Sequence, residues 1–304
     1  MKLEGIHHIT AITGAAQRNL DFYARVLGLR LVKKTVNQDD PTVYHLFYAD
    51  EKGSPGADLT FFEYPGAAPG TAGDGMVHRI VWRVGSQEAI DFWTSRLGAE
   101  GVDAAPVDGR LRFSDPEGLE HELLVSDSPD APLIADHPEV PGEMALQGFD
   151  GVRAYAGQPD ASAGLLRELG FEPAGEAWEL RGEQRGGLYA YDAPPTEPAR
   201  PGGGTVHHVA FASQMDDHEA WRERAQEGGA HPTPVIDRFW FRSIYFREPS
   251  GVLFEIATMG PGFTTDEDPE HLGESLVLPP RFEPQRDRIE DALTPLDSPR
   301  ATAR

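Results

Sequence analysis

A short unit recurs four times along this chain, and this recurrence limits the fold more than any other feature of the sequence. The first copy has a strand-like segment at residues 3–12, a helical pattern that ends at Gly28, and three further strand-like runs, LRLVKKTV, VYHLFYAD and ADLTFFEY. A Gly/Ala/Pro-rich linker, PGAAPGTAGDG, follows, and the pattern then restarts. The order strand, helix, strand, strand, strand predicts an α+β fold built from βαβββ modules.

The repeats divide the chain into four modules and a tail. In the second module Ser86 is suited to cap a helix that Gly98 ends. The third module has the weakest pattern, and the Pro/Gly-rich segment APPTEPARPGGG separates it from the fourth. The predicted divisions are module 1 at 1–65, module 2 at 74–127, module 3 at 148–193, module 4 at 204–260, and a C-terminal arm at 261–304 with a short helix near 288–293.

Two modules carry a pair of adjacent histidines on their first strand. GIHHITAIT contains His7 and His8, and GTVHHVAFA contains His207 and His208. Glu255 lies in the apolar run that closes module 4, and a buried glutamate is rare unless it is paired or binds a metal. Because neighbouring side chains of a strand point to opposite faces, we expect one histidine of each pair to face a shared cleft. The sequence therefore predicts a metal site that the first and the last module share.

Comparing the modules with one another provides an internal control. GMVHRIVWR of module 2 aligns with GTVHHVAFA, so that Arg79 stands where module 4 has His208. Module 2 keeps the closing glutamate as Glu122, whereas module 3 has neither residue and module 1 has Thr60 near the closing position. Only modules 1 and 4 together supply two histidines and a carboxylate, so we expect modules 2 and 3 to leave an empty, structural cleft.

Composition limits the chemistry further. The sequence has no cysteine, so any metal must be held by nitrogen and oxygen ligands. A net charge of −23 argues against nucleic acid as a partner, and no apolar run reaches the length of a membrane span. The first residues, MKLEGIHHITAITG, are not typical of a signal peptide, which favours a cytoplasmic location. Only four residues are lysines, which fits either a salt-adapted host or a GC-rich genome.

The repeat and its motifs resemble the vicinal oxygen chelate superfamily. GIHHITAIT, NLDFYARVLGLRLVKKTVNQDDPTVYHLFYAD, VHHVAF and DRFWFRSIYFREPSGVLFEIAT resemble, within it, the ring-cleaving dioxygenases that open hydroquinones. The resemblance implies four modules paired into two half-barrel domains, with modules 1 and 4 sharing the metal cleft. It implies Fe(II), or else Mn(II), as the metal, and O₂ and a small dihydroxylated aromatic molecule as substrates. The metal ligands that it implies are His8, His208 and Glu255.

The same resemblance places a further set of residues around the metal. Arg238 would hydrogen-bond a substrate oxygen, and Tyr245 would donate to substrate or oxygen. The alternatives are a surface ion pair for the arginine and a core position for the tyrosine. The run Phe239–Phe241 equally suits the wall of a ring pocket or the core. The residues implied by resemblance are His7, Thr10, His207, Arg238 and Tyr245, with His7 and His207 as proton carriers. We interpret His45, His78, His121, His137, His218, His231 and His271 as structural or surface residues.

Two other functions compete with ring cleavage. One is a glyoxalase-type isomerase or lyase on the same scaffold, which would use a fuller ligand set, often with a second glutamate. Thr60 at the corresponding position of module 1 argues against it. The other is a protein that sequesters a small molecule without turnover, which would not need open metal positions. Ring substituents stay open, and self-association into a homo-oligomer is compatible with the sequence.

Overall fold

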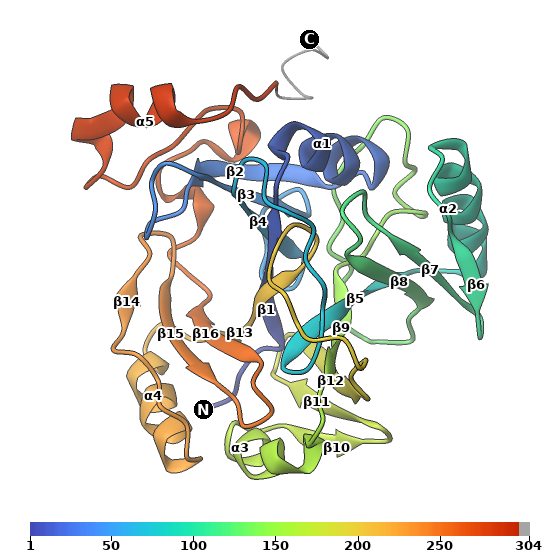
Figure 1. The fold of residues 1–304 in the computed structure, drawn as a ribbon. Helices are drawn as coiled ribbons and strands as arrows, with labels where there is room; N and C mark the ends of the chain where they lie inside the picture. Colours follow the sequence, from blue (N-terminus) through green and yellow to red (C-terminus); the bar gives the residue numbers. More distant parts are fainter. Residues whose placement is uncertain (298–304) are drawn as a thin grey trace.

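The strands form two eight-stranded sheets within residues 1–297, which are the residues that this computed structural model describes (Figure 1). The first sheet has the order β14-β15-β16-β13-β1-β4-β3-β2 and joins the two ends of the chain. Its strands are β1 (Ile6–Thr13), β2 (Arg30–Val36), β3 (Tyr44–Ala49), β4 (Asp58–Glu63), β13 (Val206–Ser213), β14 (Ile236–Asp237), β15 (Arg242–Arg247) and β16 (Leu253–Thr258).

The second sheet repeats this arrangement with the middle of the chain. Its order is β10-β11-β12-β9-β5-β8-β7-β6. In both sheets the two central strands pair antiparallel, and each has its own module's closing strand parallel beside it. The strands are β5 (Met76–Val84), β6 (Ala105–Val107), β7 (Arg110–Ser114), β8 (Glu120–Val125), β9 (Phe149–Tyr155), β10 (Glu172–Ala174), β11 (Ala177–Arg181) and β12 (Gly186–Asp192).

Helices lie on the outside of the sheets (Figure 1). The predicted cap is present, because Ser86 Oγ accepts a hydrogen bond from Ala89 N at 3.3 Å. That helix continues past Gly98 to Ala99, one residue beyond the predicted end. The helices are α1 (Ala16–Leu20), which continues as a π-helical turn η1 (Asp21–Val26), α2 (Gln87–Ala99), η2 (Pro159–Ser162), α3 (Ala163–Glu168), α4 (His218–Glu227), η3 (Phe263–Thr265), η4 (Pro269–His271), η5 (Glu283–Gln285) and α5 (Arg286–Ala292).

Aromatic side chains join the two sheets in one apolar core. Phe211 of β13 lies 5.1 Å from Phe171, ring centre to ring centre, and Phe254 of β16 lies at the same distance from Tyr189 of β12. All four rings are almost completely buried. Edge-to-face contacts of this kind stabilise a core beyond the area that they bury. The sheet that carries the histidine pairs is therefore fixed against the second sheet.

These observations confirm the predicted fold class, an α+β fold with two half-barrel sheets. The module bounds remain a prediction, and all sixteen strands lie within them. The arm begins beside β2, where Lys34 forms a parallel bridge with Leu276, and α5 begins two residues before the predicted helix. Residues 298–304 of the predicted arm lie outside the described residues. Within residues 1–297, no helix is both long and apolar enough to cross a membrane.

Candidate metal centre

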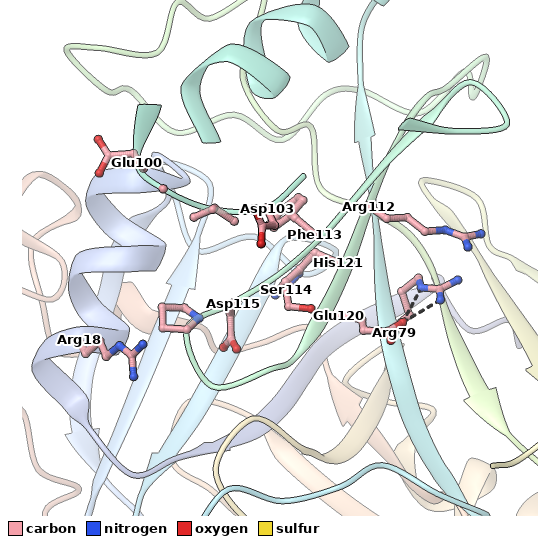
Figure 2. Close-up of a pocket in the computed structure, with 13 residues that line it drawn as sticks. Arg18, Arg79, Glu100, Asp103, Arg112, Phe113, Ser114, Asp115, Glu120 and His121 are labelled. Carbon is pink, nitrogen blue, oxygen red and sulfur yellow. Dashed lines mark hydrogen bonds and ion pairs between the residues drawn. The ribbon is translucent and has the colours of Figure 1, made fainter. Parts of the chain in front are cut away.

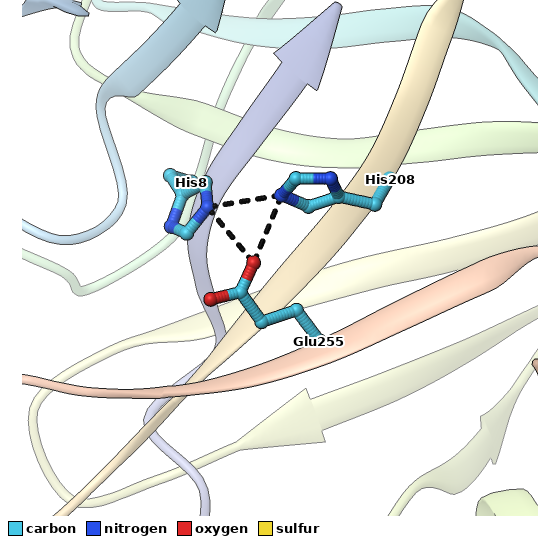
Figure 3. A group of neighbouring side chains, drawn as sticks. All are labelled: His8, His208 and Glu255. Carbon is cyan, nitrogen blue, oxygen red and sulfur yellow. Dashed lines mark hydrogen bonds and ion pairs between the residues drawn. The ribbon is translucent and has the colours of Figure 1, made fainter. Parts of the chain in front are cut away.

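Three strands of the first sheet bring His8, His208 and Glu255 together (Figure 3). The Nε2 atoms of the two histidines are 3.2 Å apart. Glu255 Oε2 lies 3.3 Å from His8 Nε2 and 2.9 Å from His208 Nε2. The side chains come from β1, β13 and β16, which are neighbours in the sheet. One nitrogen from each histidine and one carboxylate oxygen thus point to a common centre.

The donor set fits a divalent cation. All three residues are buried, and Glu255 Oε2 has no hydrogen-bond donor among the described residues. Burial alone would raise the pKa of Glu255, but His8 and His208 hold that pKa well below its usual value. A buried ionised oxygen without a donor is costly unless a cation satisfies it. Two imidazoles and a carboxylate are ligands typical of iron and manganese.

A β-bulge beside each ligand explains why the two histidines of each pair contact one another. His7 is an extra residue in β1, because the pairing register with β13 shifts between Ile6 and His8. His207 is the extra residue in β13 at the second shift. Bulges re-aim side chains, so strict alternation fails at both places. Instead of pointing to the opposite face, His7 Nδ1 contacts His8 Nδ1 at 2.9 Å, and His207 Nδ1 contacts His208 Nδ1 at 2.8 Å.

The contacts of His7 fix which nitrogen of His8 is free. His7 Nε2 lies 3.1 Å from the carbonyl oxygen of Thr258, which can only accept, so Nε2 carries a proton. Burial, reinforced by His8, lowers the pKa of His7 to about 3, and the ring is neutral at pH 7. Its Nδ1 therefore accepts a hydrogen bond from His8 Nδ1. That leaves the lone pair of His8 Nε2 directed toward Glu255 and His208.

Tyr245 and Arg238 lie next to the triad, on the side of β15. The Tyr245 ring centre is 5.8 Å from that of His208. Arg238 Nε donates to Tyr245 Oη at 3.3 Å, and both of its terminal nitrogens donate to the carboxylate of Asp39, at 3.1 and 3.0 Å. Burial and the charge of Glu255 raise the pKa of Tyr245, which therefore keeps its proton at neutral pH.

Ser243 holds the carboxylate of Glu255 by a hydrogen bond. Its hydroxyl donates to Glu255 Oε1 at 2.5 Å, and both side chains are fully buried. This bond occupies one carboxylate oxygen and leaves the other for the centre of the site. The sequence pattern gave no indication of this role for Ser243 beyond its position two residues before Tyr245, which places both side chains on one face of β15.

The triad opens into a cavity with about 30 Å³ of free space, room for roughly one water molecule. Arg238 and Tyr245 line it, whereas His7, Thr10 and His207 contact residues around it. Thr10 Oγ1, for example, lies 2.8 Å from Thr60 Oγ1. The lining also includes residues to which the sequence analysis gave no role at the site, namely Asn37, Gln38, Asp39, His45, Phe47 and Phe62.

Strand register identifies the fourth ligand position of this cleft as a threonine. Two residues after His208, Ala210 pairs with Glu255, and two residues after His8, Thr10 pairs with Thr60. Thr60 thus occupies in module 1 the position that Glu255 occupies in module 4. Neutral threonine leaves the cleft with three strong ligands rather than four.

The equivalent cleft of the second sheet is not empty, contrary to our expectation. Glu122 is fully buried there and accepts from Arg110 at 2.5 Å and Arg112 at 2.6 Å, with Arg79 at 3.5 Å. Burial alone would raise the pKa of Glu122, and the guanidinium groups of Arg110 and Arg112 lower it. The positive charges of the arginines therefore compensate the charge of this carboxylate, as a bound metal would.

A larger cavity, of about 630 Å³, lies beside this network (Figure 2). Arg79 and Arg112 line it, and its one histidine is His121. Both ring nitrogens of His121 are already engaged, by Trp82 Nε1 at 3.1 Å and by Tyr23 Oη at 3.0 Å. In spite of its size, this cavity therefore offers no free histidine nitrogen, and the convergent group of ligand atoms found within residues 1–297 lies at the smaller one.

Known proteins with similar sequences identify the family of this chain. The profile of the glyoxalase/bleomycin resistance protein/dioxygenase superfamily matches residues 5–123 and 148–256. MhqO of Bacillus subtilis (strain 168), described as a candidate ring-cleaving dioxygenase, is 40% identical over 97% of each chain. The chlorohydroquinone/hydroquinone 1,2-dioxygenase of Sphingobium indicum is 33% identical over 95% of each chain.

Solved structures agree with the sequence comparisons. A crystal structure of a candidate dioxygenase from Bacillus subtilis superposes with a TM-score of 0.91, at 40% identity over 98% of each chain. Glyoxalase I from Zea mays shares the fold, with a TM-score of 0.56 at 15% identity over 84% of this chain and 92% of that one. The chain therefore belongs to the glyoxalase/bleomycin resistance protein/dioxygenase superfamily.

Proposed function

We propose that the protein is a metal-dependent dioxygenase that opens the ring of a hydroquinone or a related dihydroxylated aromatic molecule with O₂. The observation that carries the proposal is the convergence of His8, His208 and Glu255 in a buried cleft that has Thr60 at the fourth position. The hydroquinone 1,2-dioxygenase among the relatives supports the reaction class. Nitrogen and oxygen ligands of this kind suit Fe(II), our first choice, and also Mn(II).

Three protein ligands leave more of the metal exposed than four do. Ring cleavage must bring two reactants to one centre, a substrate oxygen and O₂, and therefore needs several open positions. A second carboxylate would occupy one of these, as we expect for a glyoxalase-type enzyme. Thr60 is instead engaged by neutral neighbours, Thr10 at 2.8 Å and His45 at 2.9 Å. The ligand count thus favours the dioxygenase over the isomerase or lyase.

When bound to the triad, the metal supplies a Lewis acid at which a phenolate and O₂ can be brought together. The residues of the chain would orient the reactants. Tyr245 accepts from Arg238 and retains its own proton, so we infer that its hydroxyl donates to a reactant oxygen. Asp39 holds Arg238 in a two-pronged pair, which fixes the direction of that contact.

The remaining predicted residues act through these groups in our proposal. His7 sets the tautomer of His8 through the Thr258 carbonyl and is a positioning residue. His207 lies at the exposed rim next to His208, where it would exchange a proton with solvent. Thr10 holds the Thr60 hydroxyl. Burial lowers the pKa of both histidines, of His7 to about 3 and of His207 to about 4, so the exposed position of His207 is the reason that the role of proton carrier fits it better.

The test is an oxygen-electrode trace on protein purified without air and loaded with Fe(II). Addition of hydroquinone or methylhydroquinone should give metal-dependent O₂ uptake together with loss of the aromatic absorbance, and mass spectrometry should find both oxygen atoms of ¹⁸O₂ in the product. Bound metal without O₂ uptake would overturn the proposal in favour of an isomerase or lyase. Absence of both metal and uptake would favour a sequestering protein.

A further inference from the structure

His45 is the group that the proposed reaction has not yet used. It lies on β3, two residues before Phe47, so both side chains face the cleft. The imidazole packs between two phenylalanines, with ring centres 4.0 Å from Phe47 and 4.4 Å from Phe62. All three side chains line the cavity of the metal triad. The ring is therefore held in one orientation on the module 1 wall of the cleft.

One nitrogen of His45 is anchored and the other is open. Its Nε2 lies 2.9 Å from Thr60 Oγ1, which in turn lies 2.8 Å from Thr10 Oγ1. Its Nδ1 has no partner among residues 1–297 and is not sealed from the cavity. Burial, with the nearby His8 and His208, lowers the pKa of His45 well below its usual value, so the ring is neutral. A neutral imidazole offers one donor or one acceptor at that open nitrogen.

Apart from Tyr245, whose hydroxyl the proposed reaction already uses, the other uncharged polar groups of the lining are engaged. Asn37 donates to Tyr64 Oη and accepts from Asp39 N. Gln38 donates to the Arg238 carbonyl and accepts from Arg281. Each of these side chains would lose a protein contact if it turned to a ligand. The Nδ1 of His45 would lose none.

A hydroquinone has its two hydroxyl groups at opposite ends of the ring, whereas a catechol has them side by side. If one oxygen binds at the triad, the other must point away from it, across the cavity. The free space there is about 30 Å³, so the lining side chains must move apart to admit the ring. We propose that His45 Nδ1 hydrogen-bonds this distal hydroxyl and so selects para-dihydroxylated rings that lie among Phe47 and Phe62. A hydroxyl both donates and accepts, so either tautomer of His45 satisfies it. This inference rests on the proposed function.

The test measures binding without turnover. Protein loaded with Fe(II) under anaerobic conditions is titrated calorimetrically with hydroquinone and with 4-methylphenol, in which a methyl group replaces the distal hydroxyl. One hydrogen bond is worth about tenfold in affinity. We expect His45→Phe to bind hydroquinone about tenfold more weakly than the wild-type protein and to bind 4-methylphenol equally well. The ratio of the two dissociation constants therefore changes by about tenfold. His45→Gln, which keeps a donor and an acceptor, should restore most of the preference.

Controls separate this inference from the proposed function. His231→Phe makes the same substitution at an exposed histidine and should leave the ratio unchanged. If His45→Phe does not fold, His45→Leu removes the same hydrogen bond and decides the question. A variant that keeps the wild-type ratio overturns the role of His45, even when the wild-type protein consumes O₂ with hydroquinone. Failure of the wild-type protein to consume O₂ is the separate failure of the proposed reaction.

Discussion

Replacing Ser243 by alanine tests whether the hydrogen bond from Ser243 orients the carboxylate of Glu255. The Ser243 hydroxyl donates to Glu255 Oε1 at 2.5 Å, and both side chains are fully buried. A hydrogen bond to a charged group contributes about 1.5–3 kcal/mol, and its loss leaves a buried oxygen unsatisfied. Without it the carboxylate is free to turn away from the two histidines. We expect Ser243→Ala to weaken metal binding by about 10–100-fold, the range for partners that orient a ligand.

Two measurements decide this prediction. Competition with a chromogenic chelator gives the dissociation constant for Fe(II) or Mn(II), and urea unfolding of the metal-free protein gives the free energy of unfolding. The metal-free variant should be less stable by about 2 kcal/mol. Ser95→Ala is the matched control, because that exposed hydroxyl bonds only to a carbonyl of its own helix, at 3.1 Å. A metal affinity within about threefold of wild type and an unchanged unfolding curve would refute the reasoning.

Three further predictions concern the two clefts. His208→Ala should abolish metal retention through gel filtration, whereas His231→Ala should retain about one metal per chain as measured by elemental analysis. Arg79→His should not create a second metal site, because the register places Gly151 and Ala190 at two other ligand positions of that cleft. The metal content of this variant should therefore equal that of the wild-type protein. Burial lowers the pKa of His121 from 6.5 to about 3, so its unprotonated form stabilises the fold above pH 6.5 and this contribution is lost as pH falls toward 3. In that window His121→Asn should reduce the slope of unfolding free energy against pH by up to about 1.4 kcal/mol per unit, and an unchanged slope would contradict the assignment.

Comparison of the modules was sufficient to indicate which cleft is suited to a metal, because Arg79 stands in place of a histidine and Thr60 in place of a glutamate. The choice of His8 and His208 within their pairs came from the family resemblance and remains a prediction. The helix cap at Ser86 was also predictable, because it depends on residues only three apart. These inferences need only local pattern and internal alignment.

Features that depend on distant strands could not be predicted in this way. The bulges at His7 and His207 follow from the register of β1 against β13, and strict alternation did not predict the contact between the two histidines of each pair. The contact of Asp39 with Arg238 joins a loop to a site 199 residues away. Glu122 was expected in an empty cleft, since nothing in the sequence alone pairs it with both Arg110 and Arg112.

The pairing of β1 with β13 also determines when the site can form. The second sheet is built from modules that follow one another directly, so both of its halves are available once residue 192 has been synthesised. The first strand of the chain must wait for a partner 200 residues later, and Glu255 comes later still. Contacts of such separation form slowly. The triad therefore forms only after β16 has paired with β13, and a nascent or truncated chain that ends before β16 would lack Glu255.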